Sequence, residues 1–127
     1  MGNLLITAKG NKEESICLQA HTDMVCVSDG RYNFETQGIT VIEKEGKIHA
    51  NKTSLGADNG IGIATMMALT DTANRPTLEL LFTMGEEVGL VGAQHIELPL
   101  HAPYAINIDW SDSNTIGIGC GGTLLMQ

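Results

Sequence analysis

The sequence predicts an α/β fold, in which a layered sheet is flanked by helices. Several short apolar runs have the length of strands, and a longer apolar segment between them has the length of a helix. Strands that alternate with helices are typical of layered α/β folds. Acidic residues also follow the ends of these runs, which is where α/β sheets bind ligands.

The first two predicted strands are residues 3–8 and 15–20, separated by a turn at residues 10–13. Residues 15–20 are nearly all apolar, as is typical of a central buried strand. Cys17 lies inside this run, so we expect it to be a buried small side chain.

A hairpin is expected in the next part of the chain. Residues 40–43 and 47–50 flank Lys44-Glu45-Gly46, and they have the composition of short strands. A glycine at this position accommodates the positive φ that a tight connection needs. These residues therefore predict two antiparallel strands.

The strongest helix prediction runs from Asn59 to about Asp71, with Asp58 or Asn59 as the N-cap and Pro76 beyond the far end. Its residues are apolar almost all round, so we expect a buried helix. The later elements, in chain order, are a strand at 78–84, a weaker helix at 89–96 and a strand at 104–108.

Composition excludes several classes of protein. The chain has 127 residues, enough for one domain, and its formal charge of −8 leaves no basic stripe for nucleic acid. Without an apolar run of roughly 18 residues, a membrane span is not expected, and we predict a cytoplasmic protein. The three cysteines lack Cys-x-x-Cys spacing, so buried thiols are expected rather than disulfides or a zinc knuckle.

Four acid-bearing segments lie where an apolar run ends or a helix begins. They are His21-Thr22-Asp23, Gly56-Ala57-Asp58-Asn59-Gly60, Gly85-Glu86-Glu87 and Ile108-Asp109. If their strands are parallel neighbours, all four segments reach the same edge of the sheet. Carboxylates and an imidazole gathered in this way are the ligand set of closely spaced divalent cations.

The residue types indicate the chemistry of such a site. The imidazole of His21 binds metal through one nitrogen while a nearby carboxylate fixes the ring, and Asp58 has two oxygens with which to bridge two ions. In the pair Glu86-Glu87, one acid can ligate while the other acts as general base. Taken singly, Asp58 is also explained as a helix cap, Asp23 as a turn acid and the glutamate pair as solvated.

The same residues resemble a known family. Leu18-Gln19-Ala20-His21-Thr22-Asp23-Met24-Val25, Ser54-Leu55-Gly56-Ala57-Asp58-Asn59-Gly60-Ile61-Gly62, Thr83-Met84-Gly85-Glu86-Glu87-Val88-Gly89 and Ile106-Asn107-Ile108-Asp109 are similar to the zinc-dependent aminoacyl-histidine dipeptidases, also called Xaa-His or cytosol non-specific dipeptidases. The resemblance covers nearly the whole chain. It implies a zinc-exopeptidase-like (phosphorylase/hydrolase-like) catalytic domain.

The resemblance also implies roles for the site residues. His21, Asp58 and Asp109 would bind one zinc ion, and Asp58 and Glu87 the other, with cobalt or manganese as substitutes. Glu86 would be the general base, and Asp23 would orient the His21 side of the site. The implied activity is that of a hydrolase, a metallopeptidase that cleaves short peptides after the first residue.

This chain departs from the family pattern in its extent. The family adds a downstream histidine to the second ion and inserts a lid domain, and residues 116–127 of this chain resemble the start of that lid. Residues 1–127 are therefore expected to be a truncated, partial catalytic domain with impaired activity, also lacking an N-terminal helical segment. His49, His95 and His101 have no acid at ligand spacing in the sequence, so structural or solvated roles are expected for them.

An alternative of another class is a non-catalytic remnant that binds metal or serves as an interaction module. Sheet edges left without neighbouring strands favour pairing with another chain. A homo-oligomer is expected under either interpretation. The expected partner in the catalytic case is a short peptide substrate.

Overall fold

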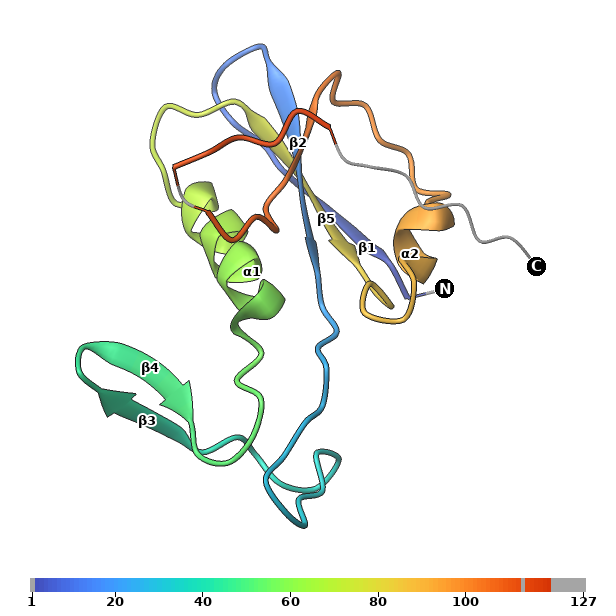
Figure 1. Ribbon diagram of the computed structural model, residues 1–127. Helices are drawn as coiled ribbons and strands as arrows, with labels where there is room; N and C mark the ends of the chain where they lie inside the picture. Colours follow the sequence, from blue (N-terminus) through green and yellow to red (C-terminus); the bar gives the residue numbers. More distant parts are fainter. Residues whose placement is uncertain (1, 113, 120–127) are drawn as a thin grey trace.

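The computed structural model describes residues 2–112 and 114–119 and confirms the α/β class. A four-stranded sheet, a two-stranded hairpin and two helices make up the described part of the chain (Figure 1). Their bounds are β1 (Leu4–Ala8), β2 (Ser15–His21), β3 (Val41–Lys44), β4 (Lys47–Ala50), α1 (Ala57–Thr70), β5 (Thr77–Thr83), α2 (Val91–Gln94) and β6 (Ala105–Asn107).

The four-stranded sheet has the order β1-β5-β2-β6. Strand β2 pairs in parallel with both β5 and β6, whereas β1 pairs antiparallel with β5. The carboxyl ends of β2, β5 and β6 therefore meet at one edge of the sheet, as the sequence predicts. The central position of β2 explains its apolar composition.

The core lies between this sheet and α1, which packs along β2 (Figure 1). It consists of Leu18, Ala20, Met66, Leu78 and Leu80, which are each at most 5% exposed. These residues come from β2, α1 and β5. Helix α1 thus fixes the two strands that lead to the predicted site.

The predicted burial of α1 on all sides is wrong. Ile61 is 66% exposed and Met67 is 58% exposed, although Met66 between them on the chain is fully buried. The reason is that α1 covers the sheet with one face only, and no other described element packs on the opposite face. The apolar composition of α1 thus exceeds what its packing in the described residues requires.

Helix α1 begins earlier than predicted, with Gly56 as its N-cap and no side-chain cap there, but Asn59 caps the regular turns that follow. Asp58 and Asn59 have non-helical backbone angles, and the peptide bond between them is cis. The Asn59 Oδ1 accepts a hydrogen bond from the Gly62 amide at 3.0 Å, which is the N-cap contact. A Cβ at Gly62 would meet Asn59 Oδ1 at 2.1 Å and the Ile108 carbonyl oxygen at 2.4 Å, so a glycine permits this close approach.

The predicted hairpin is confirmed as β3 and β4, with Val41 opposite Ala50. Its turn places Glu45 at φ 54° and Gly46 at φ 70°, the left-handed conformation expected there. The hairpin stands apart from the four-stranded sheet in Figure 1. Helix α2 is shorter than the predicted range 89–96, since it has only four residues, Val91–Gln94.

Two of the cysteines can be placed. Cys17 is 2% exposed on β2, as predicted, and burial together with the charge of Glu79 raises its thiol pKa. Cys26 is exposed, so the prediction of a buried thiol is wrong there, because the chain has left the sheet at that point. Cys120 and most of the predicted lid segment lie outside the described residues. Within the described residues, no helix is long and apolar enough to cross a membrane.

Glu79 is a buried acid within the sheet and is 3% exposed. Its carboxylate accepts hydrogen bonds from the backbone amides of His101 and Ala102 at 3.0 Å, and the His101 Nδ1 lies 3.3 Å from Oε1. Burial alone would raise the pKa of Glu79, but these hydrogen bonds outweigh it and lower the pKa. Glu79 therefore anchors the segment that leads into β6.

We predict that Glu79→Gln lowers the free energy of unfolding by about 1–3 kcal/mol at pH 7, because one amide donor would lose its acceptor. The folded pKa of Glu79 is lowered, so its contribution is complete above the ordinary glutamate pKa and is lost as pH falls through the lowered value. The difference between the two proteins should thus shrink in acid. Urea unfolding at several pH values measures this difference in the free energy of unfolding. Glu13→Gln at an exposed site is the control, and an equally large effect of this control would contradict the anchoring role of Glu79.

Candidate metal centre

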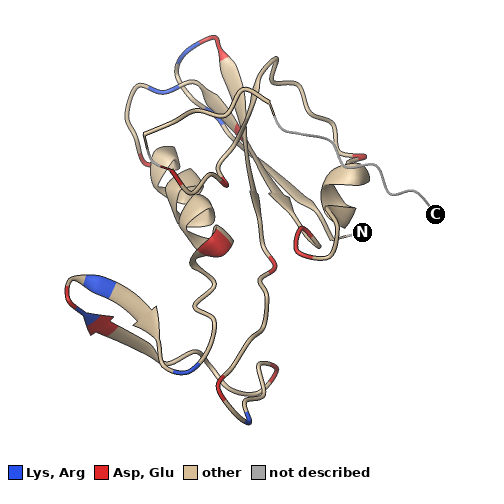
Figure 2. Ribbon diagram, in the orientation of Figure 1, with Lys and Arg blue, Asp and Glu red and all other residues tan. Residues whose placement is uncertain are grey.

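The structure brings the predicted site residues to one edge of the sheet. His21 ends β2, Asp58 lies at the start of α1, Glu86 and Glu87 follow β5, and Asp109 follows β6. Figure 2 shows acidic positions around the ends of these elements. The parallel strands thus gather segments that are far apart in the sequence, as predicted.

His21 is the centre of the cluster. Its side chain is 1% exposed, and its Nε2 lies 2.9 Å from Asp58 Oδ1 and 3.8 Å from Asp109 Oδ2. The other ring nitrogen, Nδ1, lies 2.8 Å from the backbone carbonyl oxygen of Asp23. Both nitrogens therefore face oxygen atoms.

This arrangement sets the protonation of the ring. A carbonyl oxygen only accepts hydrogen bonds, so the His21 Nδ1 carries a proton and donates a hydrogen bond to the backbone carbonyl of Asp23. In a neutral ring, Nε2 then presents a lone pair to the carboxylates of Asp58 and Asp109. A lone pair beside carboxylate oxygens is stable only with a proton or a cation between them. The donors fit a divalent cation, because zinc takes imidazole nitrogen and carboxylate oxygen.

The same contacts shift the pKa values of two of these groups. Burial opposes the charged form of His21, but the hydrogen bond with Asp58 and the charge of Asp109 outweigh it and raise its pKa. Burial and the charge of Asp58 raise the pKa of Asp109, against the opposing effect of His21. Negative charge is therefore concentrated here, which favours a bound cation.

Asp23 connects the segment after β2 with the segment after β5. Its Oδ1 accepts the Glu86 amide and its Oδ2 accepts the Glu87 amide, each at 3.1 Å. Burial alone would raise the pKa of Asp23, but these two hydrogen bonds outweigh it and lower the pKa. Asp23 thus holds His21 through its carbonyl and the glutamate pair through its carboxylate.

Glu86 and Glu87 differ in their surroundings. Glu86 is half-buried, and burial together with the charges of Asp109, Glu87 and Asp58 raises its pKa, against the effect of His21. Glu87 is exposed. Glu86 and Glu87 form one group with His21, in which one potential ligand atom of each residue lies within 4.8 Å of the others. Asp58 and Asp109 form a second such group with His21. The group of His21, Asp58 and Asp109 matches the first predicted ligand set, whereas the group of His21 with the two glutamates differs from the predicted pairing of Glu87 with Asp58.

The other histidines lie outside both groups. His101 contacts Glu79, and the His95 Nδ1 lies 2.8 Å from the carbonyl oxygen of Val91. Their structural roles are therefore consistent with the sequence analysis. His49 lies on the exposed hairpin, in β4.

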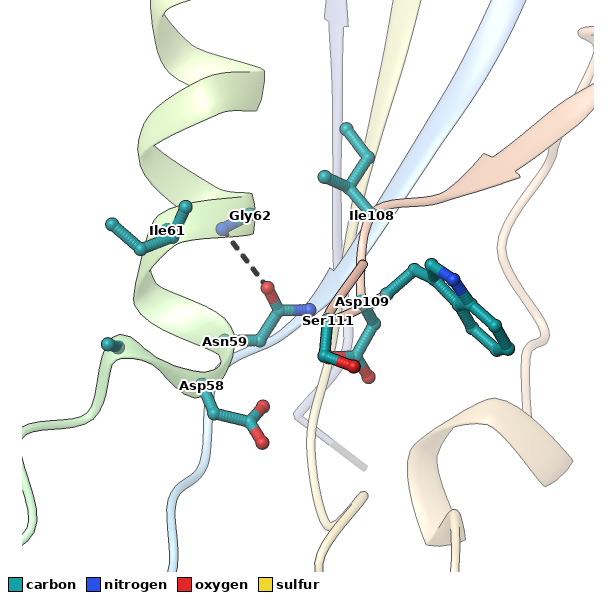
Figure 3. A pocket seen from close by; sticks show the side chains of 9 residues that line it. Asp58, Asn59, Ile61, Gly62, Ile108, Asp109 and Ser111 are labelled. Atoms are coloured by element: carbon teal, nitrogen blue, oxygen red, sulfur yellow. Dashed lines mark hydrogen bonds between the residues drawn. The ribbon is translucent and has the colours of Figure 1, made fainter. Parts of the chain in front are cut away.

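Beside the His21 cluster, a cavity of about 290 Å³ opens between the start of α1 and residues 108–111 (Figure 3). We call it the α1 cavity. Its lining consists of Ala57, Asp58, Asn59, Ile61, Gly62, Ile108, Asp109, Trp110 and Ser111. Sequence analysis identified the two acids but treated Asn59 only as a cap, although its place directly after Asp58 was a signal.

Comparison with known proteins identifies the family. The model of peptidase family M28 matches residues 3–114. The chain belongs to peptidase family M28. The resemblance to the aminoacyl-histidine and cytosol non-specific dipeptidases is also confirmed, because relatives with those names are similar to this chain.

Three relatives show how much of this chain, and how much of each relative, the similarity covers. The cytosol non-specific dipeptidase of Escherichia coli is 37% identical over 96% of this chain and 27% of its own length. The solved aminoacylhistidine dipeptidase of Vibrio alginolyticus has a TM-score of 0.78 and 32% identity, over 86% of this chain and 24% of its own. A solved tripeptidase of Staphylococcus aureus has a TM-score of 0.71 and 27% identity, over 87% of this chain and 30% of its own.

The M28 chain thus spans about a quarter to a third of these relatives. The matched region includes all the predicted site residues, because it runs from residue 3 to residue 114. The solved structures also support the α/β sheet as the common framework.

We predict that Asp23→Ala loosens the glutamate segment of this M28 family member. The amides of Glu86 and Glu87 would lose their acceptors, so their hydrogen exchange should become about tenfold faster, corresponding to about 1.4 kcal/mol for each hydrogen bond. Amide exchange followed by nuclear magnetic resonance measures this. Asp29→Ala at an exposed site is the control, and unchanged exchange in Asp23→Ala would refute the connection.

Proposed function

We propose that this chain carries the metal-binding and water-activating residues of a metal-dependent peptidase that acts on short peptides. The observation that supports this most directly is His21, whose Nδ1 is held by a carbonyl while Nε2 faces two carboxylates. The names of the relatives, a cytosol non-specific dipeptidase, an aminoacylhistidine dipeptidase and a tripeptidase, support peptides as the substrate class.

The proposed cofactor is zinc, two ions for each complete site, with cobalt or manganese as substitutes. His21, Asp58 and Asp109 would hold one ion, and Asp58 and Glu87 would contribute to holding the other. Mixed nitrogen and oxygen donors suit zinc and these substitutes. Bound ions of this kind make water acidic enough to supply a nucleophile near neutral pH.

The remaining residues have proposed roles in moving protons and fixing the ligands. Glu86 would take a proton from the attacking water and return it to the amine that leaves. Its raised pKa suits both steps, because a base with a pKa nearer neutrality also releases its proton readily. Asp23 would keep the His21 proton on Nδ1, so that Nε2 remains free to ligate.

A second candidate is a non-catalytic module that binds metal or another chain. Exposed apolar side chains favour it: Ile106 on the edge strand β6 is 51% exposed, and Tyr104 just before it is 73% exposed. Edge strands with such side chains pair readily with other chains. On the same ground we propose a homo-oligomer. A cytoplasmic location stays a prediction, supported by the name of the Escherichia coli relative.

The first test is the zinc content of the chain after equilibration and removal of free metal, by elemental analysis. We expect at least one ion per chain, with a second where its ligand set is complete. Asp58→Ala should lower the affinity more than tenfold, because this side chain would serve both ions. Asp29→Ala is the matched control. An unchanged zinc affinity in Asp58→Ala would refute the proposed metal centre.

The second test compares the rate of dipeptide hydrolysis by the Glu86→Gln variant with that of the parent. We expect the rate to fall about 10²–10⁴-fold while the zinc content stays unchanged. The parent rate should rise with pH through the raised Glu86 pKa, since only the carboxylate accepts a proton.

The same substitution is made in a chimera in which this chain replaces the matched region of the Escherichia coli dipeptidase, so that the residues are tested within a full-length peptidase. Glu13→Gln serves as the exposed control. A zinc-loaded Glu86→Gln chimera as active as its parent would exclude Glu86 as the base.

A further inference from the structure

The amide nitrogen of Asn59 is a buried donor without a partner among the described residues. Asn59 is 5% exposed. The orientation of the Asn59 side-chain amide is fixed. The backbone amide of Gly62 can only donate a hydrogen bond, so the oxygen Oδ1, rather than the nitrogen, must face Gly62. The nitrogen consequently points away from α1, toward Ser111 and Asp109 in Figure 3.

Helix capping does not explain this donor. Capping uses only the Oδ1 atom, and aspartate or serine caps as well as asparagine does. An unpaired buried polar group costs about 1–3 kcal/mol, and serine, which caps without an NH₂ group, would avoid this cost. The NH₂ group therefore indicates a second role beyond the cap.

The surroundings indicate what this donor binds. Asn59 lines the α1 cavity together with Asp58 and Asp109, so the cavity borders the His21 cluster directly. Both acids already face His21. A ligand oxygen entering here would meet negative charge, and a neutral donor next to the acids would offset that repulsion.

We propose that the Asn59 amide donates a hydrogen bond to an oxygen atom of the peptide bound in the α1 cavity. This inference rests on the proposed function and makes Asn59 a substrate-binding residue. The oxygen belongs either to the scissile carbonyl or to the terminal carboxylate, because both present the same acceptor chemistry. The cavity volume of about 290 Å³ is sufficient for part of a short peptide.

The test is calorimetric binding of the dipeptide alanyl-histidine to the zinc-loaded chain, in a Glu86→Gln background that prevents turnover. Asn59→Asp and Asn59→Ser both keep an oxygen that can cap α1 but remove the NH₂ group. We expect each to bind the dipeptide about tenfold more weakly at unchanged zinc content, and Asn59→Ser should melt no lower than the parent. Asn51→Asp adds the same charge at an exposed position and should bind as the parent does.

Two analogues identify the oxygen. One replaces the scissile carbonyl with a methylene group, and the other carries a terminal amide instead of the carboxylate. The analogue that lacks the bonded oxygen should bind the parent and Asn59→Ser equally. If the difference between parent and variant persists with both analogues, the partner of Asn59 is not one of these oxygens and the proposal fails.

The remaining outcomes are also decisive. Parental dipeptide affinity in both Asn59 variants would overturn the proposal, as would loss of zinc in both, since Asn59 would then act on the metal ligands instead. A zinc-loaded parent that binds no dipeptide would overturn this inference and leave the metal centre intact. A parent that binds no zinc would overturn the proposed function together with it.

Discussion

The parallel pairing of β2 with β5 and β6 determines where His21, the glutamate pair and Asp109 lie. The register runs from Ser15 opposite Thr77 to His21 opposite Thr83, and β6 joins β2 from Cys17 to Gln19. The Thr22 amide extends the pairing by donating to the Thr83 carbonyl at 2.8 Å. A shift by one residue would turn His21 to the other face of the sheet, because side chains alternate along a strand. The sheet core and the candidate metal centre therefore depend on the same register.

The cluster at the sheet edge is held by hydrogen bonds with backbone groups rather than by opposite charges. Asp23 accepts two amides from the glutamate segment, and its carbonyl accepts the His21 proton. Side chains of Glu86 and Asp109 are left with raised pKa values, because they are partly buried beside other acids. Such an arrangement concentrates negative charge at a fixed place, and a bound divalent cation would relieve it.

The sequence predicts the strands and the gathering of the candidate site residues at one sheet edge, because both leave local signals. Apolar runs mark β2 and β5, and the acids that follow them mark the edge of the sheet. What it does not predict depends on contacts between distant segments. The exposure of Ile61 follows from which face of α1 meets the sheet, and the exposure of Cys26 follows from where the chain leaves it. The acceptor role of Asp23 toward the Glu86 amide likewise requires both segments in place.

Two groups at this edge direct bonding capacity at the site. His21 Nε2 lies 2.9 Å from a carboxylate oxygen, which calls for a proton or a cation between them, and Asn59 Nδ2 is a buried donor, which calls for an oxygen. Both are fixed by backbone contacts on their other side, the Asp23 carbonyl for His21 and the Gly62 amide for Asn59. Under the proposed function, a bound cation and a neutral donor would both stabilise negative charge that develops on a peptide oxygen. The fold therefore holds two complementary groups beside the same acids, and neither is free to turn away and pair elsewhere.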